Sequence, residues 1–197
     1  MFIDYLSTHW LEIFGVITGL IYIGLEIKQQ ASMWIMGFVS TAVYVFVFMS
    51  SRLYADMCLN LYYSFISIYG YWKWKTNSQK SASTEGSNYP TLTLKMAVVL
   101  IVVTIIFYAT LSFILKRYTD SEIPYHDSII TSMSIVGTWM LAKKYIYHWY
   151  IWIFVNGFSV GVFCWKGLYP TAVLFLIYFI LSWYGFWEWN KVRTEKA

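Results

Sequence analysis

The stretch YGYWKW, at Tyr69–Trp74, returns as YGFWEW at Tyr184–Trp189, an offset of 115 residues. The same offset also pairs positions far from these two hexapeptides: Lys28 with Lys143, Trp34 with Trp149, Leu53-Tyr54 with Leu168-Tyr169, and Ser67 with Ser182. Chance does not keep one register through several helices and loops. The sequence therefore indicates an internal duplication of a unit about three helices long.

The composition of the chain excludes an ordinary soluble domain. Of the 197 residues, 59% are hydrophobic and 22% aromatic, whereas only 12% are charged. Soluble domains carry about 25% charged residues, so lipid is the better solvent for this surface. The net charge of +4 comes from basic residues near the expected helix ends, so we interpret it as membrane topology and expect no nucleic-acid partner.

We therefore expect an all-α integral membrane protein of seven transmembrane helices, since a span takes about 20 residues. The expected helices are 10–27, 33–49, 54–74, 92–115, 127–142, 149–165 and 169–189. In this division, 10–74 is the first three-helix repeat, 75–91 a cytoplasmic linker, 92–115 a connecting transmembrane helix, 127–189 the second repeat, and 190–197 a cytoplasmic tail.

The connecting helix decides how the two repeats are oriented. Three helices are an odd number, so two copies joined directly would be inverted, and one extra span makes them parallel. This 3+1+3 order is typical of transporters. Ten of the fourteen Lys and Arg residues fall on the side of the 75–91 segment, which predicts an external N-terminus and a cytoplasmic C-terminus.

Polar side chains inside the expected spans mark the candidate substrate site, because they are costly in lipid unless they pair or line a cavity. An amide has four hydrogen-bonding positions that a helix backbone cannot satisfy, so Asn60 and Asn156 lead the list. We expect the site between the two repeats. The candidate binding residues are Asn60, Ser64, Thr138, Trp139, Trp152 and Asn156, and the candidate gate residues are Trp149, Tyr63 and Tyr178.

The chemistry of these side chains favours a small flat ligand that is neutral or cationic. Indole faces attract cations, and no Lys or Arg lies in mid-span to hold a phosphate or carboxylate. The acids Glu12, Glu26 and Asp127 fall near the expected membrane surfaces, where we expect them to be solvated. Transport without ion coupling follows from that placement.

Enzyme, metal and cofactor readings find no support in the motifs. The sequence has no P-loop, no CxxC and no Gly-x-Ser-x-Gly, and its histidines do not share a helix face. We therefore expect no cofactor and no metal. Cys58 and Cys164 each stand in an apolar run, which predicts two buried free thiols.

The motifs in their order resemble the PnuC family over roughly residues 10–191: YGYWKW, then Trp149-x-x-Trp152-x-x-x-Asn156, then Lys166-Gly167-Leu168-Tyr169, then YGFWEW. The resemblance implies a carrier in the bacterial inner membrane, similar to the SWEET sugar carriers in its helices. It implies uptake of a vitamin-type nucleoside, chiefly nicotinamide riboside, by facilitated diffusion, with a kinase trapping the product. It also implies a homotrimer.

Two alternatives stay open. Riboside carriers of the family are expected to have Gln at the position of Asn60, Asn at that of Ser67 and Gln near Thr138, and this sequence departs from all three. Thiamine, another flat cation carried by relatives named PnuT, is therefore the second substrate. A membrane receptor or scaffold that does not transport is the alternative class.

Overall fold

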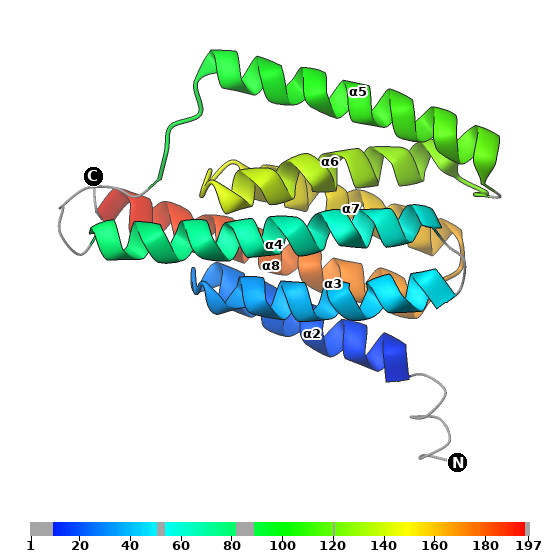
Figure 1. Cartoon of the computed structure of the whole chain (residues 1–197), viewed down its shortest axis with the longest axis horizontal. Coiled ribbons are helices and arrows are strands. Elements are labelled where there is room, and N and C mark those ends of the chain that lie inside the picture. Colours follow the sequence, from blue (N-terminus) through cyan, green and yellow to red (C-terminus); the bar gives the residue numbers. More distant parts are fainter. Residues whose placement is uncertain (1–9, 51–53, 82–88, 120, 196–197) are drawn as a thin grey trace. The chain divides into compact units, whose positions relative to one another are not determined.

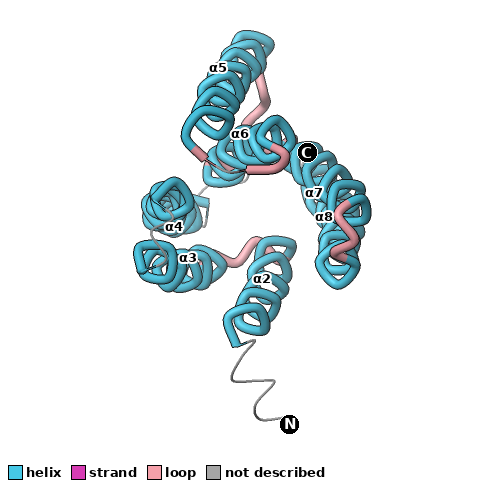
Figure 2. Tube along the Cα trace, turned by 90° about the vertical axis from the view of Figure 1, so that its right-hand side faces the viewer, coloured by secondary structure: helices cyan, strands magenta, loops and turns pink. Residues whose placement is uncertain are grey.

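A computed structural model describes residues 10–50, 54–81, 89–119 and 121–195 (Figure 1). In these ranges the chain forms seven helices and no strand. Figure 2 shows the same chain as a tube coloured by secondary structure. The helices are α2 (Trp10–Ile27), α3 (Ser32–Ser50), α4 (Tyr54–Ser81), α5 (Leu94–Tyr118), α6 (Pro124–Ala142), α7 (His148–Trp165) and α8 (Tyr169–Glu195). The predicted number and order of the helices are confirmed.

Two predicted helix ends were wrong for the same physical reason. α4 runs to Ser81 instead of Trp74, so the first part of the predicted linker is helical, and α8 runs to Glu195 instead of Trp189. The polar residues after each tryptophan include good helix formers such as Lys75, Gln79 and Lys191. Their polarity marks where a span would leave the apolar layer, but the backbone continues its hydrogen bonds beyond that point.

The helices differ in how well they suit lipid. By length and composition alone, α3, α5 and α8 qualify as membrane spans, and α2 contains a shorter apolar helix, Phe14–Ile27. α5 buries very little of its apolar surface, with Leu94 82% exposed, which fits a helix bathed in lipid. α6 shows the opposite pattern with nine buried residues, because it packs against both α5 and α7.

The chain divides into two compact units, residues 1–85 and 86–197. In the first unit α3 packs against both α2 and α4. Trp34 on α3 meets Trp74 on α4 edge to face, with ring centroids 5.8 Å apart. A Cβ atom on Gly70 would lie less than 3.0 Å from the Trp34 indole, so only glycine leaves room for this ring.

The second unit repeats this packing between α7 and α8. Trp149 and Trp189 meet edge to face at the same 5.8 Å, and the Trp149 indole lies against Gly185 under the same restriction. All four tryptophans are at most 1% exposed. We call these two sets, Trp34–Gly70–Trp74 and Trp149–Gly185–Trp189, the aromatic clamps. They show that the duplication seen in the sequence is also a duplication of local structure.

The turns that lead into the clamps repeat as well. Gln29 (φ 54°) and Lys144 (φ 59°) are the non-glycine residues with positive φ in the described chain, and they stand 115 residues apart. The amide after each one bonds back in the same way, Gln30 to the Leu25 carbonyl and Tyr145 to the Met140 carbonyl, both at 3.0 Å. The left-handed residue reverses the chain so that the next helix starts beside the previous one.

Three residues differ from expectation in how far their side chains are exposed. Cys58 and Cys164 are free thiols but exposed, so the prediction that they are buried was wrong. A span that is apolar on all sides gives no periodicity that separates lipid-facing from buried positions. Glu26 is only 3% exposed and not solvated, because the chain reverses right after it at Gln29. The Glu12 side chain lies outside the described residues.

The clamp in the second unit yields a stability prediction. Gly185→Ala should lower the free energy of unfolding by about 1–3 kcal/mol, because the added methyl overlaps the Trp149 indole. Thermal unfolding of the purified protein in detergent, followed by tryptophan fluorescence, measures the effect.

Gly161→Ala on α7 is the matched control, since a Cβ there meets nothing within 4 Å. It should leave the melting temperature unchanged or raise it, because alanine favours a helix over glycine by about 1 kcal/mol. Equal melting temperatures for the two variants would contradict a tight clamp.

Candidate functional site

One buried face of α7 carries the most distinctive polar groups of the second unit. Trp152 and Asn156 are four residues apart and so lie on one side of the helix, together with Val155. Asn156 is 7% exposed, and the Trp152 Nε1–H is buried with no hydrogen-bond partner among the described residues. An indole and an amide therefore lie on one face of α7.

Asn156 also joins two helices. Its Nδ2 donates to Ser182 Oγ on α8 at 3.0 Å, and that hydroxyl donates to the Tyr178 carbonyl at 2.7 Å. The contact satisfies part of the amide inside the protein. The amide also carries an oxygen, which is the hydrogen-bond acceptor that it can offer to a ligand.

The first unit has a contact between two hydroxyl groups at the corresponding place. Thr41, which stands where Asn156 stands in the second repeat, lies with its Oγ1 2.9 Å from Ser64 Oγ on α4. Ser64 also donates to the backbone carbonyl of Asn60, again at 2.9 Å. Of the predicted residues in this unit, Ser64 is thus buried in helix packing, and Asn60 is half-buried one turn away.

In one contact between the first two helices of each repeat, the large side chain and the glycine have changed places between the repeats. In the first unit Tyr22 on α2 packs over Gly37 on α3, where a Cβ would come 3.0 Å from the phenol ring. In the second unit the glycine is on the first helix, Gly137, and the large ring is Trp152 on α7, 3.8 Å from a Cβ on Gly137. The α7 indole thus takes the space that a tyrosine of the neighbouring helix takes in the other copy.

Both predicted site residues on α6 contact other groups of the second unit. Thr138 is buried and donates to the Ser134 carbonyl at 2.8 Å. Trp139 lies in the last turn of α6, where Tyr145 stacks on it at 6.1 Å and the Lys143 ammonium sits 5.7 Å from its ring. A ligand that used this indole would compete with the Lys143 cation.

The gate candidates occupy three different surroundings. Trp149 is fully buried in the aromatic clamp, so its movement would require the clamp to open. The Tyr63 ring lies 5.4 Å from that of Tyr62, and the Tyr178 ring lies 6.0 Å from Phe175. The structure gives no observation that assigns them to a gate, and this role stays a prediction.

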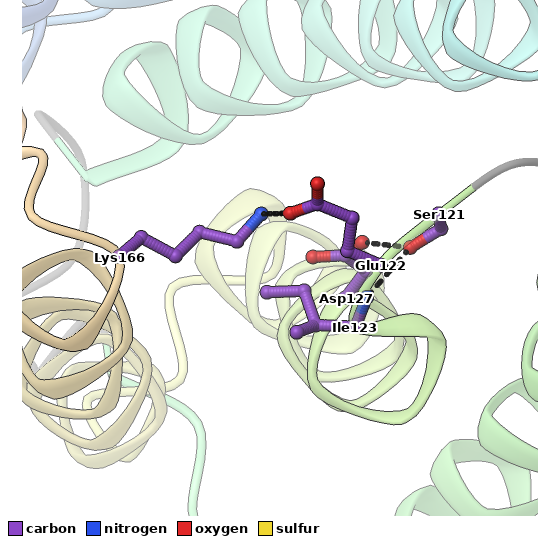
Figure 3. Close-up of polar contacts among 5 residues, drawn as sticks. All are labelled: Ser121, Glu122, Ile123, Asp127 and Lys166. Atoms are coloured by element: carbon purple, nitrogen blue, oxygen red, sulfur yellow. Dashed lines mark hydrogen bonds and ion pairs between the residues drawn. The ribbon is translucent and has the colours of Figure 1, made fainter.

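A second polar region lies where α5 turns into α6 (Figure 3). Ser121 donates to Asp127 at 2.7 Å, and Lys166, from the α7–α8 turn, pairs with Glu122 at 3.3 Å. Glu122, Ile123, Trp165, Lys166 and Leu168 line an open cavity of about 430 Å³. The Asp127 carboxylate accepts a local hydrogen bond at the start of α6, which supports a role at the helix end over a role in proton coupling.

Ser159 is a polar residue of the same span as Asn156 that was not placed in the candidate set. It is 1% exposed, stands one turn beyond Asn156 on α7, and its Oγ has no partner in the described structure. An unpaired buried hydroxyl costs about 1–3 kcal/mol. A serine in a span is most often a packing residue, and the sequence alone does not show whether its hydroxyl is bonded. Elsewhere, no three His, Cys, Asp or Glu side chains of the described residues gather to hold a metal ion.

Comparison with known proteins gives consistent matches along nearly the whole chain. The family described as nicotinamide mononucleotide transporter matches residues 9–191. The nicotinamide riboside transporter PnuC of Escherichia coli is 24% identical over 210 residues, which cover 95% of this chain and 88% of the relative. PnuC of Haemophilus influenzae is 28% identical over 186 residues, covering 93% and 80%.

Among solved structures, the crystal structure of the vitamin B3 transporter PnuC is similar with a TM-score of 0.74. The alignment covers 98% of this chain and 86% of that chain at 20% identity. At this identity the similarity establishes the fold.

The Asn156–Ser182 contact can be tested by removing its acceptor. Ser182→Ala should lower the free energy of unfolding by about 0.6–1.7 kcal/mol, the range of hydrogen bonds between membrane helices. Ser67→Ala is the matched control at the equivalent position of α4, where the hydroxyl donates to the Tyr63 carbonyl of its own helix. A melting temperature lowered equally by both changes would show that the interhelical bond adds nothing.

Proposed function

This chain belongs to the nicotinamide mononucleotide transporter family, and on that premise we propose that it carries nicotinamide riboside across the bacterial inner membrane. The observation that carries the proposal is the α7 face on which an indole, whose N–H has no partner among the described residues, precedes a buried amide. An aromatic face stacks on a flat ring, and an amide can bond a carboxamide at the edge of that ring.

The charges of the helices favour the riboside over the mononucleotide. α2, α3, α6 and α7 contain no Lys or Arg, and α4, α5 and α8 carry theirs toward the helix ends. A phosphate inside the membrane would need such a partner. The riboside instead carries a pyridinium cation, which indole faces attract by about 0.5–2 kcal/mol each.

The proposed roles of individual residues follow their surroundings. Trp152 stacks on the ring and Asn156 bonds a polar group of the substrate, with Asn60 as the second amide. Ser64, Thr138 and Trp139 complete the proposed set, and Trp149, Tyr63 and Tyr178 remain the proposed gate. Two observations support the central pair: both side chains lie on one helix face, and the Trp152 N–H is buried without a partner in the described chain.

The proposed topology is the 3+1+3 order with α5 as the connecting helix, an external N-terminus and a cytoplasmic C-terminus. The repeated clamps and turns support a duplication that includes α2–α4 and α6–α8. α5 has no counterpart in that repeat and exposes an apolar surface that suits lipid. Assembly as a homotrimer is part of the same proposal and rests on the family.

The proposed mechanism is facilitated diffusion through an alternating-access cycle. No nucleotide-binding loop is present in the sequence, and Asp127 accepts a hydrogen bond from Ser121, which supports transport that is not coupled to ATP or to a proton at that carboxylate. A separate cytoplasmic kinase would phosphorylate the riboside. The product could not return, because its phosphate would find no cationic partner in the helices.

Thiamine is the second candidate substrate. The hydroxyls of Ser67 and Thr138, at two of the positions where the sequence departs from riboside carriers, both donate to carbonyls of their own helices. Neither proton is then available to a ligand. A substrate with fewer hydroxyl groups than a riboside would lose least from this arrangement.

Calorimetric binding to the purified protein, with nicotinamide riboside, its mononucleotide and thiamine in parallel, tests the choice of substrate. We expect binding of the riboside and none of the mononucleotide. Binding of thiamine alone would reverse the order of the two candidates. Counterflow of labelled substrate into proteoliposomes tests transport itself, since a receptor or scaffold would bind without exchanging the label.

The role of Trp152 is tested by Trp152→Ala, which should weaken riboside binding by about tenfold, because one stacked ring contributes about 1 kcal/mol or more. Trp187→Ala is the control, since this indole is 58% exposed on α8. Its binding constant should stay that of the unaltered protein. An equal loss of riboside affinity in both variants would show that the ring of the substrate does not stack on Trp152.

A further inference from the structure

The starting observation is the set of buried polar atoms without a partner in the described chain. These are Nε1 of Trp34, Trp149 and Trp152 and Oγ of Ser112 and Ser159. Trp34 and Trp149 are equivalent in the two repeats, so their unpaired N–H groups belong to the duplicated clamps. Trp152 and Ser159 have no such equivalent, because the first repeat has Gly37 and Tyr44 there.

Ser159 departs from the usual behaviour of serine in a helix. A helical hydroxyl commonly donates to the carbonyl four residues earlier, as Ser182, Ser67 and Thr138 do here. Ser159 makes no such bond although it is 1% exposed, so its hydroxyl is neither satisfied by its own helix nor wetted at the surface. Packing does not explain a buried polar group that is left free.

The position of Ser159 relates it to the proposed site. Seven residues separate it from Trp152, and at 100° each they return to within about 20° of the same direction. Along the helix axis the two positions are about 10.5 Å apart, with Asn156 between them. A buried face of α7 thus presents, in order, an N–H donor, a carbonyl acceptor and a hydroxyl that can do both.

We propose that Ser159 Oγ hydrogen-bonds a hydroxyl of the substrate's sugar while the substrate is enclosed in the carrier. This inference rests on the proposed function. A nucleoside is a flat base joined to a hydroxyl-bearing sugar, so it can stack at Trp152 and reach the next turns of the same helix. Because Ser159 is enclosed, only a ligand that is itself occluded can meet it, and a carrier passes through such a state.

The proposal makes the effects on stability and on binding opposite in sign. Ser159→Ala removes an unpaired buried hydroxyl, so the melting temperature of the empty protein should stay the same or rise. The same change should weaken riboside binding about fivefold to tenfold, the value of one hydrogen bond. Ser159→Cys, of similar size and a weaker donor, should bind with an intermediate constant.

Ser112→Ala is the matched control, because this serine on α5 is also buried and unpaired. It should change the melting temperature as Ser159→Ala does and leave riboside binding unaltered. The specific hydroxyl is identified with riboside analogues that each lack one sugar hydroxyl. One analogue should bind the unaltered protein and Ser159→Ala equally well, because its missing group is the one that Ser159 bonds.

Two results would overturn the assignment while the proposed function stands. One is a Ser159→Ala variant that melts lower and binds the riboside as before, which would make the hydroxyl structural. The other is a loss of affinity that is the same for every analogue. If the unaltered protein fails to bind the riboside at all, the proposed function fails first, and the assignment to a sugar hydroxyl fails with it.

Discussion

The contact of an indole with a glycine in each aromatic clamp is the constraint on which the other features depend. Trp149 is fully buried against Gly185, and no side chain larger than hydrogen fits beside it. Since the ring has one place to lie, the clamp fixes the rotation and the height of α7 relative to α8 at that end. The direction in which Trp152, Asn156 and Ser159 point follows from that rotation.

The two copies of the repeat share the aromatic clamps but differ in the residues at the middle of the helices. The ring geometry and the left-handed turns at Gln29 and Lys144 agree between the copies. Along α3 and α7, however, Gly37, Thr41 and Tyr44 are replaced by Trp152, Asn156 and Ser159. A packing role would be served equally well by the same residues in both copies. Divergence gathered on one buried face is what an asymmetric ligand requires, because its two ends need different partners.

The sequence was sufficient for features that depend on composition and repetition. It placed the starts of α2, α4 and α8 at Trp10, Tyr54 and Tyr169, because aromatic residues and turns mark where the helices begin. It failed where the outcome depends on which side of a helix is covered, as for Cys58, Cys164 and Glu26, since a helix surrounded by lipid can be apolar on every side. Ser159 was left out of the candidate set because a sequence does not show whether a buried hydroxyl is bonded, and here it has no partner in the described chain.

The unpaired groups on α7 also fit the energetics of a carrier without an energy source. Such a carrier must bind its substrate, release it and return empty, so neither state can be far more stable than the other. Complete pairing of Trp152, Asn156 and Ser159 within the protein would stabilise the empty form and leave nothing for the substrate to bond. The bond from Asn156 to Ser182 holds the amide in place. The cost of the groups left unpaired is then recovered only when a substrate with matching polar groups is enclosed.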